Sequence, residues 1–211
     1  MIKVTIKFNS DFHIGSGLGK ANYIDSLFVK DSRRNPIIPG QTLKGVIKDS
    51  CVRIANSFGI KNCVSDNTTK RHICPCIICR IFGRESQSAK YLFSPARLKT
   101  DDKDREYPVR RRTSIDAETG TAKEKALFST EVAPQNLEFE FTINQKSGGQ
   151  SGKSERTLLE AGILWTREIG GNRRRGLGHC RMTIEEINRA ALKKGLKKLR
   201  NINKKVEVGN V

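Results

Sequence analysis

The 211-residue chain is short of acidic residues and of long apolar segments. It has 22 Asp and Glu against 40 Lys and Arg, and no stretch approaches the roughly 18 consecutive apolar residues of a membrane-spanning helix. Residues 2–8 alternate apolar and polar side chains, as a strand does, and lack the apolar block of a secretory signal. A P-loop, a dinucleotide-binding fingerprint and a Ser-His-Asp order are also missing. We therefore expect a cytoplasmic protein without a membrane partner.

The charge balance predicts a polyanionic partner. The formal net charge is +18 and the isoelectric point is near 10.0. Such an excess opposes the compact state through self-repulsion and is usually matched by phosphate contacts. A basic surface with no specific ligand is the plain alternative. An acidic membrane is a weaker one, because no basic amphipathic helix with a large aromatic face is present. We favour RNA or DNA as the partner.

Hydrophobic periodicity predicts one α+β domain over residues 1–211. The predicted elements are strands at 2–8, 91–93, 137–143 and 180–184 and helices at 42–58 and about 154–168. Thr42 is placed to cap the first helix, and Gly59 to end it. The order strand, helix, strand, strand, helix, strand is that of a ferredoxin-like (RRM-like) antiparallel sheet with helices on one face.

Two insertions and a basic end add to this order. Residues 60–90 hold a cysteine cluster, whereas residues 97–130, within the predicted second insertion 95–135, are polar, charged and poor in large apolar side chains. Within the second insertion, the turn residues of Asp116-Ala117-Glu118-Thr119-Gly120 predict a β-hairpin. Residues 185–211 predict a basic helix or tail, for which a solvated face explains the lysines as well as a function does.

The cysteine cluster predicts a zinc site. Four of the six cysteines fall within 17 residues, and Cys76-x-x-Cys79 has the spacing that lets two thiolates bind one zinc ion. With His72, Cys74 and Cys63 nearby, five candidates compete for four places. We predict that Cys76, Cys79, Cys74 and His72 bind a structural zinc ion, with Cys63 as the substitute ligand. Of the other two cysteines, Cys51 falls on the apolar face of a helix and Cys180 in a strand, so we expect both in the core.

Two basic segments are candidates for RNA contact. Glycines surround Arg173, Arg174 and Arg175 in the segment 170–178, where they allow a close approach to phosphates that guanidinium groups bind in a bidentate manner. Lys44 and Lys48 lie one turn apart on the polar face of the first predicted helix. We predict that these five side chains bind the RNA backbone.

Asp25 and His13 are the candidates for catalysis. Asp25 lies in a glycine-rich segment, and a loop aspartate is most often a solvated or turn-capping residue. Within an RNA-binding groove, however, a carboxylate can hold a divalent cation such as Mg²⁺. His13 follows the first strand, where its imidazole is either structural or a base toward a ribose 2′-hydroxyl.

Five segments, in order along nearly the whole chain, resemble signature segments of the RAMP superfamily. The nearest match is the repeated Csm/Cmr-type backbone subunit of type III CRISPR effector complexes. The segments are Ile14-Gly15-Ser16-Gly17 with Tyr23-Ile24-Asp25, Ile38-Pro39-Gly40-Gln41-Thr42-Leu43-Lys44-Gly45, the cysteine segment up to Gly83, Arg112-Thr113-Ser114-Ile115-Asp116 with Phe128 to Glu131, and the loop 170–178.

The resemblance implies a place in an RNA-guided complex. Such subunits stack head to tail along a guide CRISPR RNA, beside other type III effector subunits, and a thumb-like hairpin, here within 95–135, separates guide from target at regular intervals. In members that cut, an aspartate before the Pro-Gly helix supports metal-dependent cleavage of the complementary target RNA. Asp25 occupies that place, although Ser26-Leu27 follows it where the family more often has Asn-Pro.

Two alternative functions fit the same segments. One is the endonuclease of the same superfamily that trims guide-RNA precursors, with His13 as the base. It usually lacks a zinc knuckle and a long thumb. The other is a non-catalytic, zinc-stabilised RNA-binding protein in which Asp25 is only a loop residue.

Overall fold

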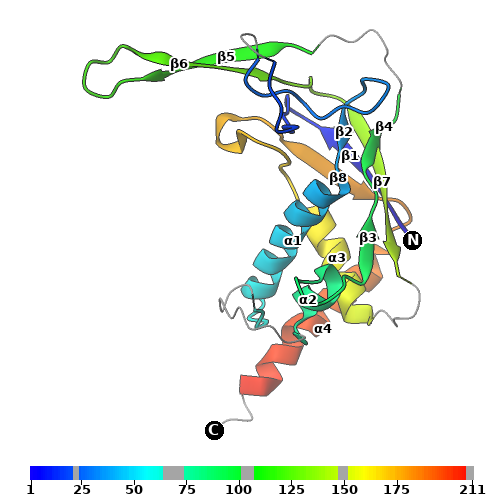
Figure 1. Ribbon diagram of the computed structural model, residues 1–211. Coiled ribbons are helices and arrows are strands. Elements are labelled where there is room, and N and C mark those ends of the chain that lie inside the picture. The colour runs from blue at the N-terminus through cyan, green and yellow to red at the C-terminus, as the bar shows by residue number, and fades with distance from the viewer. Residues whose placement is uncertain (21–23, 64–73, 101–106, 147–151, 208–211) are drawn as a thin grey trace.

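A computed structural model describes residues 1–20, 24–63, 74–100, 107–146 and 152–207 (Figure 1). The elements follow the chain in this order: β1 (Ile2–Phe8), β2 (Ile37–Ile38), α1 (Gly40–Ser57), α2 (Ile77–Phe82), β3 (Tyr91–Phe93), β4 (Ala96–Leu98), β5 (Val109–Ile115), β6 (Ala122–Glu131), β7 (Glu138–Gln145), α3 (Lys153–Trp165), the 3₁₀ turn η1 (Arg173–Arg175), β8 (Cys180–Ile184) and α4 (Arg189–Glu207).

The main sheet is antiparallel and has the strand order β2-β4-β7-β1-β8, with β3 also paired to β7. The α+β prediction is thereby confirmed. Within this sheet, β8, β1 and β7 lie side by side, and the strands that follow α1 pair with the far edge of β7. This arrangement is compatible with the predicted ferredoxin-like fold.

Alternation along β1 separates a buried face of the sheet from an open one. Ile2, Val4, Ile6 and Phe8 are buried, while Lys3 and Lys7 are exposed. The helices lie on one side of the sheet, where α3 packs against both α1 and α4 (Figure 1). In the described part of the chain, no helix is both long and apolar enough to cross a membrane.

Three boundaries differ from the sequence predictions. Helix α1 begins at Gly40 after Pro39, so Thr42 lies inside its first turn and does not cap it. The start at Gly40 fits tightly, because a Cβ there would meet the carbonyl oxygen of Phe93 at 2.3 Å. Helix α3 ends at Trp165, and Ala96–Leu98, predicted as part of the hairpin insertion, form β4 of the main sheet.

Strands β5 and β6 form a separate two-stranded sheet that extends away from the helices (Figure 1). Its register runs from Val109 opposite Glu131 to Ile115 opposite Ala122. The predicted turn closes it, since Gly120 N–H donates to the Asp116 carbonyl at 3.0 Å. Most hairpin side chains are exposed, and burial begins only where β6 reaches the body of the protein.

A cluster of aromatic rings joins the irregular segment 12–38 to the end of the sheet. Phe12 stacks on Phe8 with a centroid distance of 3.6 Å, and Phe139 and Phe28 meet the Phe12 ring edge-on. All four rings are buried. Their packing fixes the start of the segment that carries His13 and leads to Asp25.

Candidate functional site

His13 is buried and hydrogen-bonded through both ring nitrogens. Its Nδ1 lies 2.6 Å from the main-chain oxygen of Glu131, and its Nε2 lies 3.0 Å from Ser26 Oγ. A carbonyl oxygen can only accept, so Nδ1 carries a proton, and in the neutral ring Nε2 then accepts the hydroxyl hydrogen of Ser26. This arrangement joins segment 12–38 to the end of β6 and favours a structural role for His13.

Asp25 lies at the same junction, but its side chain is exposed. Its Oδ2 accepts a hydrogen bond of 2.6 Å from the Ser129 N–H, and its own N–H donates to the Ser129 carbonyl at 3.0 Å. Ser26 pairs with Thr130 through a parallel bridge. The carboxylate of Asp25 is therefore held at the root of the β5–β6 hairpin.

A buried acid reinforces this junction. Glu131, at the end of β6, is 6% exposed and accepts the Phe28 N–H at 2.9 Å. Its second oxygen forms an ion pair with Lys30, whose ammonium group also lies 4.8 Å from the centre of the Tyr107 ring. A carboxylate buried with an ionic partner and a backbone donor holds loop and hairpin in one arrangement.

The glycine-arginine loop, residues 170–178, meets the same junction from the other side. Gly171 N–H donates to the His13 carbonyl at 2.8 Å, and a Cβ at Gly170, whose φ is +102°, would meet that oxygen at 2.3 Å. Glycine is therefore required at position 170. Arg173–Arg175 form η1 with exposed side chains, and none of the three forms an ion pair within the described residues.

Arg112 joins the hairpin to the glycine-arginine loop. Its guanidinium donates to Asn172 Oδ1 at 2.8 Å and to Thr130 Oγ1 at 2.9 Å. Burial and the nearby cations Arg175 and Arg110 lower the pKa of Arg112. Positive charge thus gathers where the hairpin, the loop within segment 12–38 that carries Asp25 (the aspartate loop) and the glycine-arginine loop meet, and such a site attracts phosphate.

Lys44 and Lys48 lie elsewhere, in a cleft of about 540 Å³ between the start of α1 and the segment after α2. Arg84 and Lys146 also line this cleft. Burial, Lys48 and Lys146 lower the pKa of Lys44. Arg173 lines a different cleft, so the five predicted RNA-binding side chains form two groups and not one.

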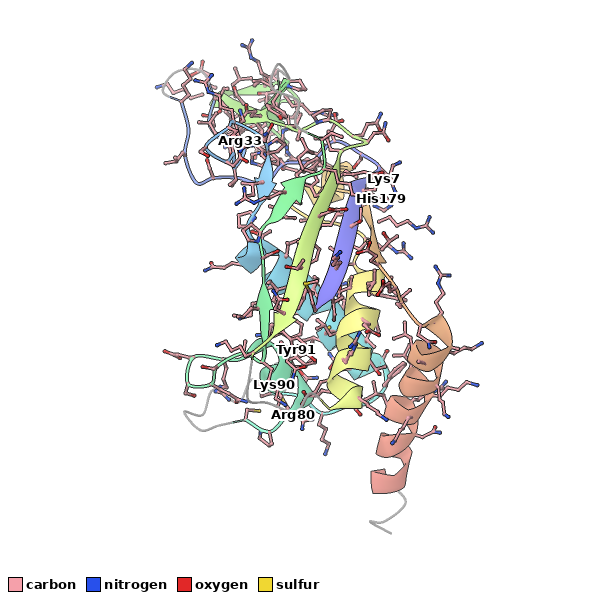
Figure 2. The ribbon with its side chains drawn as sticks, turned by 90° about the vertical axis from the view of Figure 1, so that its right-hand side faces the viewer. Lys7, Arg33, Arg80, Lys90, Tyr91 and His179 are labelled. Carbon is pink, nitrogen blue, oxygen red and sulfur yellow. The ribbon has the colours of Figure 1, made fainter. Side chains whose placement is uncertain are left out.

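The open face of the sheet, seen in Figure 2, carries lysines that are already paired with acids. Because these ion pairs offset their charge, this face is a weaker attractor for phosphate than the glycine-arginine loop. The pairs are Lys3 with Glu185 at 3.3 Å, Lys7 with Glu138 at 3.5 Å and Lys99 with Glu140 at 2.9 Å.

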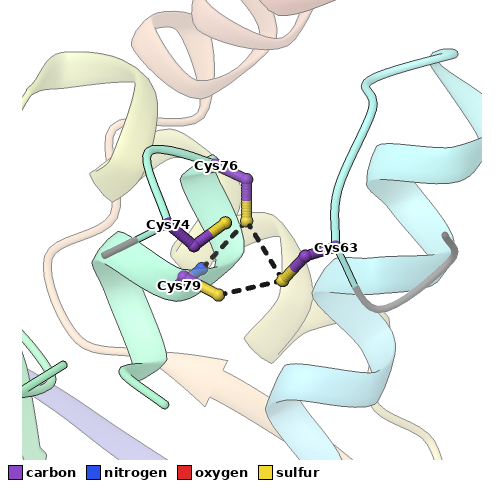
Figure 3. Close-up of side chains that lie close together, drawn as sticks. All are labelled: Cys63, Cys74, Cys76 and Cys79. Atoms are coloured by element: carbon purple, nitrogen blue, oxygen red, sulfur yellow. Dashed lines mark hydrogen bonds between the residues drawn. The ribbon is translucent and has the colours of Figure 1, made fainter. Parts of the chain in front are cut away.

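Four cysteines gather at the start of α2, where Cys63 approaches Cys74, Cys76 and Cys79 (Figure 3). All four sulfur atoms lie within 4.8 Å of one another. Sulfur atoms bound at 2.3 Å around a tetrahedral zinc ion are about 3.8 Å apart. The Cys63 and Cys76 sulfurs are separated by 3.8 Å, and those of Cys63 and Cys79 by 3.1 Å. The cluster can therefore hold a metal ion such as zinc.

Three of the four predicted zinc ligands lie together in the structure. Cys74, Cys76 and Cys79 come together as expected, with Cys63, the predicted substitute, as the fourth cysteine. His72 lies outside the described residues. Four protein sulfurs would leave no open position for a substrate, which is the arrangement of a structural zinc site. Cys51 and Cys180 are buried in the core, as predicted.

The thiols differ in how readily they ionise. Burial opposes ionisation of Cys76, but hydrogen bonds from the backbone N–H groups of Cys63 and Cys79 outweigh it and lower its pKa to about 7. Burial raises the pKa of Cys63, and burial together with the neighbouring thiols raises that of Cys79. Cys76 is therefore the thiol most easily ionised at neutral pH, and a metal ion that binds Cys63 and Cys79 would displace their protons.

Comparison with known proteins places these features in one family. The RAMP superfamily model matches residues 5–181, which include the second half of β1, both loops of the junction, the hairpin and the start of β8. The comparison with curated proteins found no match. The chain therefore belongs to the RAMP superfamily, a family of CRISPR-associated RNA-binding proteins.

Proposed function

We propose that this chain is the guide-RNA-binding backbone subunit of a type III CRISPR effector complex and that it cuts complementary target RNA beside each copy. Copies would stack head to tail along the guide in the cytoplasm, together with other subunits of the complex. Family membership and the net charge of +18 support RNA as the ligand.

The observation that carries the catalytic part is the position of Asp25. An exposed carboxylate is fixed by the Ser129 amide at the root of a hairpin that projects into solvent. Arginines of the glycine-arginine loop lie beside the same root, with Arg112 bonded to Asn172 of that loop. An acid in a basic surface repels RNA unless it has a cation to hold, so its fixed position favours a role in chemistry.

Asp25 would hold one divalent cation together with the RNA. Mg²⁺ is usually held through one or two carboxylates together with substrate phosphates, and Asp25 supplies one carboxylate. When bound, the cation offsets the charge that develops on the scissile phosphate. Attack by a 2′-hydroxyl needs an in-line geometry that a regular A-form helix lacks. A hairpin inserted between guide and target would supply that geometry by turning one nucleotide out of the duplex.

The junction explains how hairpin and carboxylate would act together. His13, Ser26 and Glu131 join the aspartate loop to β6, and Arg112 joins β5 to the glycine-arginine loop. A nucleotide displaced by the hairpin would therefore meet Asp25 at a fixed distance along the strand.

The decisive experiment assembles the protein with a guide RNA and incubates the complex with a labelled complementary RNA. We expect an RNA-protein filament by size measurement and products at regular intervals that require Mg²⁺. Trimming of a guide precursor without cutting of a complementary target would assign the protein to the processing endonucleases. A filament that binds the target and leaves it intact would assign it to non-catalytic RNA binding.

A further inference from the structure

Trp165 is the only tryptophan of the chain, and its indole is 62% exposed at the end of α3. One exposed apolar side chain is ordinary on a protein surface. What distinguishes Trp165 is that it lines a cleft of about 220 Å³ that runs from α1 to the glycine-arginine loop.

Three segments form this cleft. Val46, Asp49, Ser50 and Arg53 come from α1, residues 165–168 follow from the end of α3, and Arg173 comes from η1. Helices α1 and α3 lie side by side (Figure 1), and the backbone after α3 leads directly into the glycine-arginine loop. The indole and Val46 give the cleft an apolar surface, while Arg167 and Arg173 add positive charge.

The polar groups of the cleft separate into paired and unpaired ones. Ser50 and Thr166 bond each other at 2.9 Å, and Arg53 pairs with Asp49 at 3.0 Å. In contrast, Arg167 and Arg173 form no ion pair within the described part of the chain. A phosphate would be attracted to these two guanidinium groups and repelled by the carboxylates of Asp49 and Glu168.

We propose that this cleft binds one unpaired nucleobase of an RNA strand, stacked on Trp165, while Arg173 and Arg167 hold the adjoining phosphates. A base has the flat face that an indole stacks on, and its amino and imino groups are donors for carboxylates. This inference rests on the proposed RNA-binding function and adds a second contact to it. It places a single-stranded nucleotide on the α1 side of the glycine-arginine loop.

The single tryptophan makes the test direct, because intrinsic tryptophan emission reports only this position. The probes are a single-stranded oligoadenylate, the same strand in a blunt RNA duplex, and inorganic polyphosphate, which has the charge but no bases. We expect strong quenching by the single strand, weak quenching by the duplex and none by polyphosphate. Binding is followed separately by the anisotropy of labelled RNA.

Substitutions provide the second arm. Trp165→Ala should weaken single-strand binding about tenfold, within the range measured for one stacked base, and Trp165→Phe should recover much of that loss. Thr183→Ala is the control, since Thr183 is exposed on β8, outside both clefts, and its replacement should change nothing. Urea unfolding checks that each variant keeps its stability.

The outcomes separate this inference from the proposed function. RNA binding by anisotropy without quenching, or equal quenching by polyphosphate, overturns base stacking and leaves the RNA-binding function standing. A concentration-dependent emission shift without RNA would make the cleft a contact between copies of the chain and also overturn it. Failure to bind any RNA would overturn both.

Discussion

The carboxylate of Asp25 accepts a 2.6 Å hydrogen bond from the backbone N–H of Ser129, which lies 104 residues further along the chain. This bond holds a loop aspartate against a strand of the projecting hairpin. The side chain of Asp25 stays exposed, but the hydrogen bond restricts its conformational freedom relative to that of an unbonded loop residue. A group held in this way can act on a strand that the same hairpin distorts.

Replacing Asp25 tests this relationship. We predict that Asp25→Ala leaves assembly and target binding intact and slows cutting at least about a hundredfold, equivalent to about 3 kcal/mol of activation free energy. Asp25→Asn can still accept the Ser129 hydrogen bond but lacks the charge, so we expect nearly the same loss. A time course with labelled complementary RNA measures the rates.

The two variants also separate two explanations. If Asp25→Asn cuts at the wild-type rate and only Asp25→Ala fails, then position and not charge matters, and the cation proposal is wrong. Equal rates for both variants and the wild type would place the chemistry on another residue.

The sequence predicted β1, β3, β7 and β8 and helices α1 and α3 because their buried side chains follow period 2 in strands or period 3.6 in helices. The alternation of Ile2, Val4 and Ile6 is one example, and it reappears as the buried face of β1. The start of α1 was misplaced because Thr42 looks like a cap, whereas Pro39 and a tight contact at Gly40 decide where the helix begins.

The junction around Asp25 could not be predicted in the same way. It depends on backbone groups, such as the Ser129 N–H and the Glu131 carbonyl. Every residue except proline has both groups, so the sequence does not show which of them make these contacts. Arg112 is one of many arginines in a polar segment, and only the fold shows that it reaches Asn172. Similarly, spacing alone left five candidates for four zinc positions, and the fold brings Cys63 to the other cysteines.

The fourth ligand of the metal site can be identified by substitution. We predict that Cys63→Ser reduces the zinc content of the purified protein to less than about half an equivalent and lowers its stability. His72→Ala should retain close to one equivalent, because four cysteines already satisfy a tetrahedral site. Elemental analysis gives the content. The opposite result, zinc lost only with His72→Ala, would exchange the two ligands.

Zinc affinity should depend on pH with a definite sign. Thiols must lose their protons to bind, and burial raises the pKa of Cys63 and Cys79 while that of Cys76 is lowered to about 7. Raising the pH from about 6 to about 8 should therefore increase the affinity, by up to about tenfold per unit for each displaced proton. Competition with a chelator measures this slope, and a flat profile would contradict thiolate ligation.

We predict that the buried ion pairs of Glu155, near the cysteine cluster, contribute to the stability of the folded protein. The Glu155 side chain is 2% exposed and pairs with Arg80 at 3.2 Å and with Lys90 at 3.0 Å, joining α3 to α2 and to the residue before β3. Figure 2 labels these two cations. Glu155→Ala removes the buried carboxylate that both cations contact, and we expect a loss of about 2 kcal/mol in the free energy of unfolding, since both cations are partly solvated.

Urea unfolding with Asp49→Ala as the control checks this value. Asp49 forms the exposed i,i+4 pair with Arg53, so its removal should cost less than about 0.5 kcal/mol. Equal losses for the two variants would mean that burial of Glu155 adds nothing to its ion pairs.

We predict that the glycine-arginine loop contributes to the salt dependence of RNA binding. Each phosphate neutralised on a single strand contributes a slope of roughly −0.7 to the plot of log affinity against log salt. Arg173, Arg174 and Arg175 are exposed and have no acidic partner among the described residues, so their joint replacement by alanine should flatten the slope by about two. The matched control is a triple alanine variant of Lys3, Lys7 and Lys99, which removes the same charge from the open face of the sheet.

Because those lysines are already paired with glutamates, their replacement should leave the slope nearly unchanged. If both triple variants flatten it equally, net charge and not the loop governs binding, and the glycine-arginine loop has no special place on the RNA surface.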